Sequence, residues 1–234
     1  MRRAAGTAFR LIAYVAFLAS FAWLFAFVGN WLLPRTIDSG RPAGLGEALA
    51  VDVGWFVLFG LQHSTMARAR VKERLLRVVP PELERSLFVL VSALLVMLLL
   101  WQWRPLPAVV WDVQAMPWRP LLVGLYLAGW LQLLASSFFI DHFALFGLRD
   151  ATPTPLGTPY LYRYVRHPLY LGLLVAVWAT PFMTVGHALF ALGMTTYTLI
   201  GVRFEERDLV RHFGPAYRDY QSRVPMLLPF RIRR

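Results

Sequence analysis

The residues best suited to ligand binding or catalysis lie at positions 163–172, RYVRHPLYLG, where a polar linker meets an apolar segment. Pro168 suits the first turn of a helix, because its missing N–H would have no partner there and its ring presets φ. A helix that begins near Pro168 offers free N–H groups and a positive dipole end, and Arg163 and Arg166 lie just before it. The segment therefore predicts a seat for a small anionic group.

Two adjacent acids, Glu205 and Glu206, begin the polar stretch EERDLVRHFGPAYRDY directly after the last apolar run. One interpretation is a solvated interfacial helix in which the acids pair with arginines on the same face. The alternative is a cation site, which we favour because the acids abut an apolar span on the same predicted side as the anion seat. An anion seat beside paired acids suits a zwitterion, or a zwitterion that carries an additional positive charge.

His63 and His142 lie near the ends of predicted spans and are candidate general bases. A structural hydrogen bond is the alternative interpretation for each of them. The spacings of His63, Ser64, His142 and His167 include no close ligand pair, so we predict no metal site. The chain has no cysteine, which excludes disulfides, thiolate ligands and a cysteine nucleophile.

These residues must be positioned by apolar helices, because 58% of the 234 residues are hydrophobic and several runs reach membrane-spanning length. We predict an all-α polytopic membrane protein with about six transmembrane helices. The predicted spans are residues 8–33, 47–66, 82–103, 118–140, 168–185 and 186–203. The last two have almost no connection, so they predict a tight helical hairpin that turns near residues 181–187. A cytoplasmic C-terminal amphipathic helix is expected to follow, within residues 204–234.

The net charge of +11 is carried in short loops and in the tail, a distribution typical of membrane topology and not of nucleic-acid binding. Six spans place both termini on one side, and the basic connections predict that this side is the cytoplasm. Asp52 lies inside the second span and is expected to face the bundle or the outer interface. Within one integrated membrane domain, we assign residues 1–142 to the substrate side and residues 143–234 to cofactor binding.

Two separated patterns carry a family resemblance: R-x-x-R-H-P-x-Y-x-G from residue 163 and E-E-x-x-L-x-x-x-F-G-x-x-Y-x-x-Y from residue 205. Together they resemble the cofactor-binding half of the superfamily of integral-membrane isoprenylcysteine carboxyl and phospholipid methyltransferases. Four strings in the rest of the chain are similar to the bacterial methanethiol S-methyltransferases: FGLQHSTMAR (59–68), ERSLFVL (84–90), WQWRPLP (101–107) and DHFALFGLR (141–149). One departure is Asp141, where this family pattern leads us to expect asparagine.

The resemblance implies S-adenosylmethionine as methyl donor and a small thiol as acceptor, with dimethyl sulfide as the product if the thiol is methanethiol. The donor's carboxylate would suit the Pro168 helix with Arg163 or Arg211 nearby, and its ammonium and sulfonium groups would suit Glu205 and Glu206. The implied cofactor residues are Arg163, Tyr164, Arg166, His167, Pro168, Tyr170, Gly172, Glu205, Glu206, Arg211 and Tyr217. The catalytic candidates are His142, His63 and Asp141. No glycine fingerprint of a soluble nucleotide-binding fold is present.

Two other functions stay open from the sequence. The acceptor would be lipid-borne if the site methylated a prenylcysteine carboxylate or a phospholipid amine. A membrane carrier or assembly factor would bind an anion without chemistry, but transport favours charged residues near the middle of the bilayer. This chain gathers its charged residues at one predicted face, which favours an enzyme in the bacterial cytoplasmic (inner) membrane. The sequence leaves the natural thiol and the oligomeric state undetermined.

Overall fold

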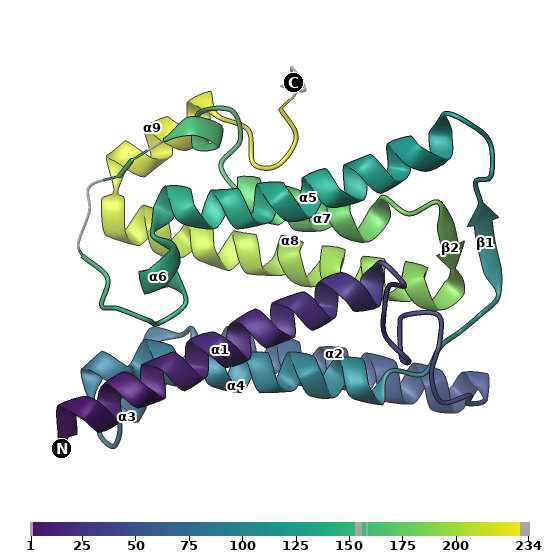
Figure 1. The fold of residues 1–234 in the computed structure, drawn as a ribbon. Helices are drawn as coiled ribbons and strands as arrows, with labels where there is room; N and C mark the ends of the chain where they lie inside the picture. The colour runs from purple at the N-terminus through teal and green to yellow at the C-terminus, as the bar shows by residue number, and fades with distance from the viewer. Residues whose placement is uncertain (1, 153–155, 158, 230–234) are drawn as a thin grey trace. The chain divides into compact units, whose positions relative to one another are not determined.

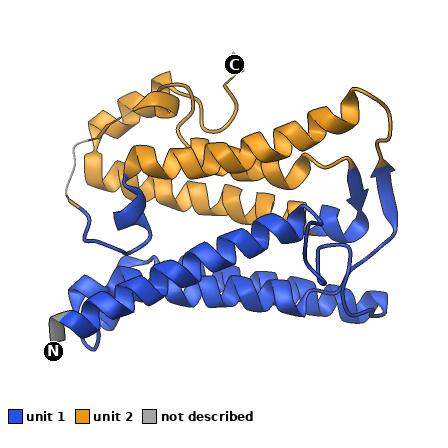
Figure 2. Cartoon of the chain, viewed as in Figure 1, with its two compact units in different colours: residues 1–111, 141–151, 182–189 blue, residues 112–140, 152–181, 190–234 orange. Residues whose placement is uncertain are grey.

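The computed structural model describes residues 2–152, 156–157 and 159–229 (Figure 1). The parts of the predicted linker and tail at residues 153–155, 158 and 230–234 lie outside the described residues. The chain divides into two compact units, one formed by residues 1–111, 141–151 and 182–189 and the other by residues 112–140, 152–181 and 190–234 (Figure 2). These units follow packing, whereas the predicted division at residue 142 concerns function and stays a prediction.

Three long helices form most of the first unit, with α4 packed against both α1 and α2. Their bounds are Arg2–Val28 for α1, Leu45–Met66 for α2 and Pro81–Gln102 for α4. The unit also contains two short helices, α3 at Ala69–Leu75 and α6 at His142–Leu145. A small two-stranded sheet pairs β1 (Val109–Asp112) with β2 (Phe182–Thr184), and the sequence pattern did not predict it.

The second unit contains α5 (Trp118–Ile140), the 3-10 turn η1 (Tyr160–Arg163), α7 (Pro168–Trp178), most of α8 (Val185–Phe213) and α9 (Pro215–Arg223). Helices α7 and α8 are antiparallel neighbours here. The Tyr170 hydroxyl near the start of α7 donates to Glu205 late in α8 at 3.0 Å. The Trp178 indole at the end of α7 donates to Thr195 earlier in α8 at 2.9 Å.

Helix α5 approaches α7 so closely that two glycines meet at the contact. A Cβ atom added to Gly172 would lie 2.6 Å from the carbonyl oxygen of Gly129, closer than real Cβ contacts allow. Glycine at both positions therefore allows the two backbones to touch. The motif glycine Gly172 thus has a packing role that fixes where α7 lies.

Within the described residues, five helices are long and apolar enough to cross a membrane, which confirms the predicted all-α polytopic membrane class. They are Ala4–Val28, Leu45–Met66, Pro81–Gln102, Trp118–Ile140 and Val185–Phe213. The sixth apolar helix, α7, has 11 residues and ends at Trp178, before the predicted end at residue 185. Pro181 explains the early end, because proline removes a helix donor and disfavours helical geometry in the residue before it.

Helix α8 has 29 residues and ends at Phe213, ten residues beyond the predicted end of the last span. No helix-breaking residue follows position 201 until Gly214, whose φ of 59° lies in the left-handed region, and Pro215 then starts α9. Glu205 and Glu206 therefore belong to the same rigid helix as the apolar residues before them. The side of the membrane that holds each terminus stays a prediction.

Candidate functional site

The centre of the candidate site in the second unit is an ion pair between Arg166 and Glu206. The Arg166 Nε donates to Oε1 of Glu206 at 2.6 Å, and the two side chains are only 10% and 14% exposed. The other end of the Arg166 guanidinium donates to the backbone carbonyls of Gln221 and Val224 at the end of α9. Such charge-assisted bonds are short and directional. Arg166 therefore connects the segment directly before α7 with α8 and with the end of α9.

Glu206 is also held by two further donors. His167 Nε2 lies 3.0 Å from the same oxygen, Oε1, and the Gln221 amide donates to Oε2 at 3.0 Å. Both oxygens of the carboxylate are thus engaged by protein groups. Glu206 is a clamp that binds the R-H-P segment to α8 and α9.

The tail covers the backbone at the start of α7. The N–H groups of Arg166 and His167 donate to the carbonyls of Pro225 and Met226 at 2.9 and 3.1 Å. The predicted free donors of this segment are therefore used in part by the protein itself. The N–H groups in the first turn of α7, at Leu169 and Tyr170, lie where the helix supplies no acceptor.

Glu205 differs from Glu206, although the two are adjacent. Glu205 is exposed, and among residues 2–152, 156–157 and 159–229 the one hydrogen bond to its carboxylate comes from the Tyr170 hydroxyl. Consecutive helical residues point about 100° apart, so the two carboxylates serve different surroundings. Glu205 keeps acceptor capacity for a ligand beside the first turn of α7.

The other predicted cofactor residues divide into buried and exposed groups. Pro168 is buried at the start of α7, and Tyr217 is 2% exposed with its ring 5.7 Å from that of Tyr220. Arg163 and Tyr164 are exposed, as is Arg211, which pairs with Asp208 at 3.1 Å. The structure thus joins Arg166, His167 and Glu206 directly and leaves these three exposed side chains outside that network.

Two buried tyrosines of α9 lie close enough to the network for the charge of Glu206 to raise their pKa values. Burial raises the pKa of Tyr217 well above its usual range, and the Glu206 carboxylate raises it further. Burial also raises the pKa of Tyr220 to about 12. The Tyr220 hydroxyl donates to the backbone carbonyl of Tyr162, which ties α9 to η1. Both phenols therefore stay protonated throughout the physiological pH range.

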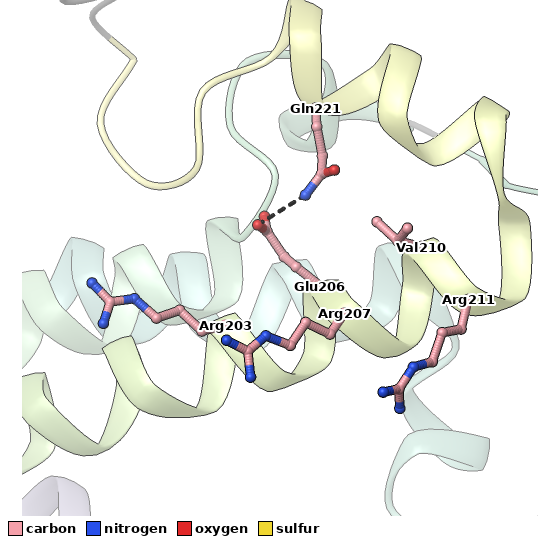
Figure 3. A pocket seen from close by; sticks show the side chains of 6 residues that line it. All are labelled: Arg203, Glu206, Arg207, Val210, Arg211 and Gln221. Carbon is pink, nitrogen blue, oxygen red and sulfur yellow. Dashed lines mark hydrogen bonds between the residues drawn. The ribbon is translucent and has the colours of Figure 1, made fainter.

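A pocket of about 370 Å³ lies on the Glu206 side of α8 and extends toward α9. Its lining consists of Arg203, Glu206, Arg207, Val210, Arg211 and Gln221. Figure 3 shows the three arginine side chains along one side of α8, with Gln221 reaching Glu206 from α9. Glu205 does not line this pocket. The two acids therefore serve different sites on the same helix.

His142 is buried in the first unit, with 3% of its surface exposed. Its Nε2 lies 2.9 Å from the Tyr14 hydroxyl, and the ring of Phe146 is 4.9 Å from the imidazole. Burial lowers the pKa of His142, and the charge of the neighbouring Asp141 opposes this shift. The imidazole is therefore neutral near pH 7, the state that a general base requires.

Asp141 has a local structural role in the same unit. Its Oδ1 accepts the Ala144 N–H at 3.1 Å, which caps helix α6, and pairs with Arg149 at 2.9 Å. The hydrogen bond from Arg149 lowers the pKa of Asp141 below its usual value. The side chain thus orders the turn that carries His142.

His63 lies in α2 and has different partners from His142. Its Nδ1 is 3.2 Å from the Ser92 hydroxyl, and its ring lies 4.6 Å from that of Phe88. Arg85 stacks over Phe88 and donates to the backbone carbonyl of Leu145 at the end of α6. The two candidate bases therefore both belong to the first unit and have different hydrogen-bond partners, Ser92 for His63 and Tyr14 for His142.

Sequence reasoning missed Tyr14, Ser92 and Gln221 as partners of the predicted residues. Gln221 lies four residues after Tyr217 on α9, so helical spacing was the signal that would have found it. Tyr14 and Ser92 are ordinary residues of apolar spans and gave no such signal. Within the described ranges, no group of three or more His, Cys, Asp or Glu residues is arranged to hold a metal ion.

Most of the chain matches one known protein family. The sequence profile described as NnrU protein matches residues 53–228, which include both units' candidate residues from His63 to Gln221. The chain belongs to the NnrU protein family. No solved structure matches this NnrU-family protein.

Several relatives of this NnrU-family protein are named methanethiol S-methyltransferase, which confirms the resemblance read from the motifs. One from Bradyrhizobium diazoefficiens, named methanethiol S-methyltransferase 2, is 48% identical over 231 residues, covering 94% of this chain and 88% of the relative. One from Mycobacterium tuberculosis is 46% identical and covers 93% of each chain. One from Crocosphaera subtropica is 41% identical, covering 94% of this chain and 90% of the relative.

Proposed function

We propose that this protein transfers a methyl group from S-adenosylmethionine to methanethiol, which yields dimethyl sulfide. The observation that carries the proposal is 41–48% identity, over nearly the full chain, to relatives named for methanethiol S-methylation. We further assign the protein to the bacterial cytoplasmic membrane with both termini in the cytoplasm, on the charge distribution of its loops. The acceptor is small and apolar, so it can reach the protein from the bilayer.

The residues of the second unit fit a cofactor with one carboxylate and two positive groups. Glu205 is an exposed carboxylate with one protein donor, Tyr170, and it lies beside the positive end of α7. In the proposed site, Glu205 attracts the ammonium or sulfonium group, and the first-turn N–H groups of α7 donate hydrogen bonds to the ligand carboxylate. Arg163 is exposed just before that turn and supplies the additional positive charge.

We assign Glu206 a positioning role instead of direct contact. Its two oxygens are occupied by Arg166, His167 and Gln221, so a ligand cation would have to displace one of these donors. Its function in the site is to hold the R-H-P segment so that the first turn of α7 faces the ligand. This refines the expectation that both acids bind the positive groups directly.

When bound, S-adenosylmethionine supplies a methyl group on positively charged sulfur and leaves as a neutral thioether. The protein must then align the thiol, exclude water and accept the thiol proton. A free thiol has a pKa of about 8.5, so a base is needed near pH 7. We propose His142 as that base, with His63 as the second candidate and Asp141 as the residue that orders the His142 turn. If Nε2 donates to Tyr14, the lone pair that takes the proton is on Nδ1 of His142.

The test is headspace gas chromatography with mass detection on the purified full chain, supplied with methanethiol and S-adenosylmethionine carrying a deuterated methyl group. We expect trideuterated dimethyl sulfide from the intact protein and at least tenfold less from Glu205→Gln at the same cofactor concentration. The label identifies the methyl donor, which an unlabelled product would leave open. The control is the protein without added cofactor, which should release no labelled product.

Other outcomes would overturn parts of this proposal separately. Cofactor binding by calorimetry with no labelled dimethyl sulfide would reject methanethiol as the acceptor and favour a lipid-borne carboxylate or amine. If the protein showed no binding and formed no product, S-adenosylmethionine itself would be rejected as the cofactor, and a carrier or assembly role would be favoured. Full activity of Glu205→Gln at low cofactor concentration would reject the assigned cation site.

A further inference from the structure

One exposed face of α8 changes from apolar to basic along the helix. Leu192 and Ile200 are 54% and 46% exposed, and Arg203, Arg207 and Arg211 follow on the same face. At 3.6 residues per turn, these positions fall within an arc of roughly 100°. The face therefore presents hydrocarbon first and guanidinium groups after it.

The length of this face matches one leaflet of a membrane. The 11 residues between Leu192 and Arg203 rise about 16 Å at 1.5 Å per residue, and half of a hydrocarbon core is about 15 Å. Helix α8 is one of the helices that are long and apolar enough to span. The arginines thus fall at the level of lipid headgroups when Leu192 lies near the middle of the bilayer.

The arginines also line a concave site, the 370 Å³ pocket between α8 and α9. The Arg207 guanidinium lies 5.5 Å from the centre of the Phe204 ring, and neither Arg203 nor Arg207 has an ion pair within the described part of the chain. Arg211 is partly neutralised by Asp208. The Glu206 carboxylate in the same pocket is neutralised by Arg166. The pocket therefore carries an excess of positive charge that protein groups do not balance.

We propose that this pocket binds the headgroup of an anionic phospholipid, with its phosphate at Arg203 and Arg207 and its acyl chains along Leu192 and Ile200. Guanidinium groups bind phosphate oxygens in a fixed fork geometry, and basic side chains at the membrane surface attract anionic lipids. The site is separate from the proposed cofactor site, because Glu205 and the first turn of α7 do not line it.

The experiment is native mass spectrometry of the full chain in detergent, with phosphatidylglycerol and phosphatidylcholine of identical acyl chains added in equal amounts. No S-adenosylmethionine is present, so the result does not depend on the proposed reaction. We expect a single phosphatidylglycerol adduct with an affinity about tenfold higher than that of the phosphatidylcholine adduct. The double variant Arg203→Gln/Arg207→Gln should lose this preference, with its affinity for phosphatidylglycerol falling about tenfold.

The matched control is Arg70→Gln/Arg74→Gln, which removes the same charge at the same helical spacing from exposed positions of α3. This variant should keep the lipid preference. Arg203→Lys/Arg207→Lys keeps the charge but loses the guanidinium fork, so it should fold and show a preference between those of the unchanged protein and the Gln variant. Calorimetry should give the same affinity for S-adenosylmethionine in Arg203→Gln/Arg207→Gln as in the unchanged protein.

Four results would overturn the proposal. Equal binding of both lipids would show that the headgroup charge is not recognised. An equal loss in the α3 variant would show a general charge effect. Displacement of phosphatidylglycerol by millimolar inorganic phosphate would identify a site for a free anion instead of a lipid. A large fall in affinity for S-adenosylmethionine in Arg203→Gln/Arg207→Gln would assign the pocket to the cofactor.

Discussion

The Nε atom of Arg166 lies 2.6 Å from Oε1 of Glu206, so the residue two positions before α7 is tied to the carboxylate that α8 carries near its end. Both side chains are mostly buried, and His167 and Gln221 complete the contacts of that carboxylate. A paired charge in such a place stabilises the local structure mainly because its loss leaves the partner unpaired. Within the E-E motif, Glu206 therefore stabilises the structure, and Glu205 is left to bind the ligand in the proposed site.

Glu206→Gln is expected to destabilise the protein in the absence of any ligand. The substitution leaves the buried Arg166 without its counter-charge, at a cost of roughly 3 kcal/mol. The measurement is thermal unfolding in detergent, followed by tryptophan fluorescence, where the midpoint should fall by several degrees. An unchanged midpoint would show that the carboxylate is not a structural clamp.

Glu205→Gln is the matched change one residue earlier, and we expect the opposite pattern. Its thermal midpoint should stay close to that of the unchanged protein, because Glu205 is exposed and accepts one bond, from Tyr170. Its affinity for S-adenosylmethionine should fall by about tenfold or more, the value of a hydrogen bond to a charged group. Calorimetric titration measures this, and an unchanged Kd would place the ligand cation elsewhere.

The sequence alone could predict that the two motifs meet, but not which acid has which role. Glu205 and Glu206 are adjacent and identical, and their difference arises from helical phase relative to α7 and α9. That phase depends on the continuation of α8 to Phe213, ten residues beyond the predicted end of the span. Apolar composition marks where a span begins and ends in lipid, whereas a helix continues through charged residues until a breaker such as Gly214.

The apolar spans were predictable because hydrophobic runs of this length have few other structural outcomes. The β1–β2 pairing was not, because it depends on a contact between segments that are distant in the sequence. The same limit applies to the hydrogen bond between Tyr14 and His142, which are 128 residues apart. Motifs report residue types in order, and such partners become visible only when the helices are packed.

The pH dependence of stability should reveal the buried state of His142. Burial places its folded pKa below 6.5, its ordinary value, so the unfolded state binds more protons between these two values. The stabilisation is complete above pH 6.5 and is lost progressively as the pH falls toward the folded pKa. His142→Gln cannot titrate, so the unchanged protein should lose thermal stability relative to this variant below pH 6.5.

Thermal midpoints of both proteins between pH 5 and 8 test this expectation. His63 and the carboxylates are present in both proteins, so their contributions largely cancel in the difference. The opposite result would be a thermal midpoint of the unchanged protein that falls relative to that of His142→Gln as the pH rises above 6.5. It would mean that the folded pKa of His142 is raised and that the imidazole is charged in the fold.

The Gly129–Gly172 contact predicts that the motif glycine is required for packing before any ligand binds. In Gly172→Ala the new methyl group would meet the Gly129 carbonyl at 2.6 Å and the Leu133 N–H group at 2.7 Å, both rigid backbone atoms. Overpacking of this kind costs about 1–3 kcal/mol, and separation of α5 from α7 would also move the first turn of α7. We expect a lower thermal midpoint together with weaker cofactor binding.

Gly124→Ala is the control in the same α5 helix, since a Cβ atom there meets nothing within 4 Å. Alanine is the better helix former by roughly 0.5–1 kcal/mol, so this variant should be as stable as the unchanged protein or slightly more so. Gly129→Ala should resemble Gly172→Ala, because its methyl group meets the α7 backbone at 2.7 Å. If Gly172→Ala weakened cofactor binding without lowering the thermal midpoint, while Gly129→Ala changed neither, the glycine would act at the ligand and not at the helix contact.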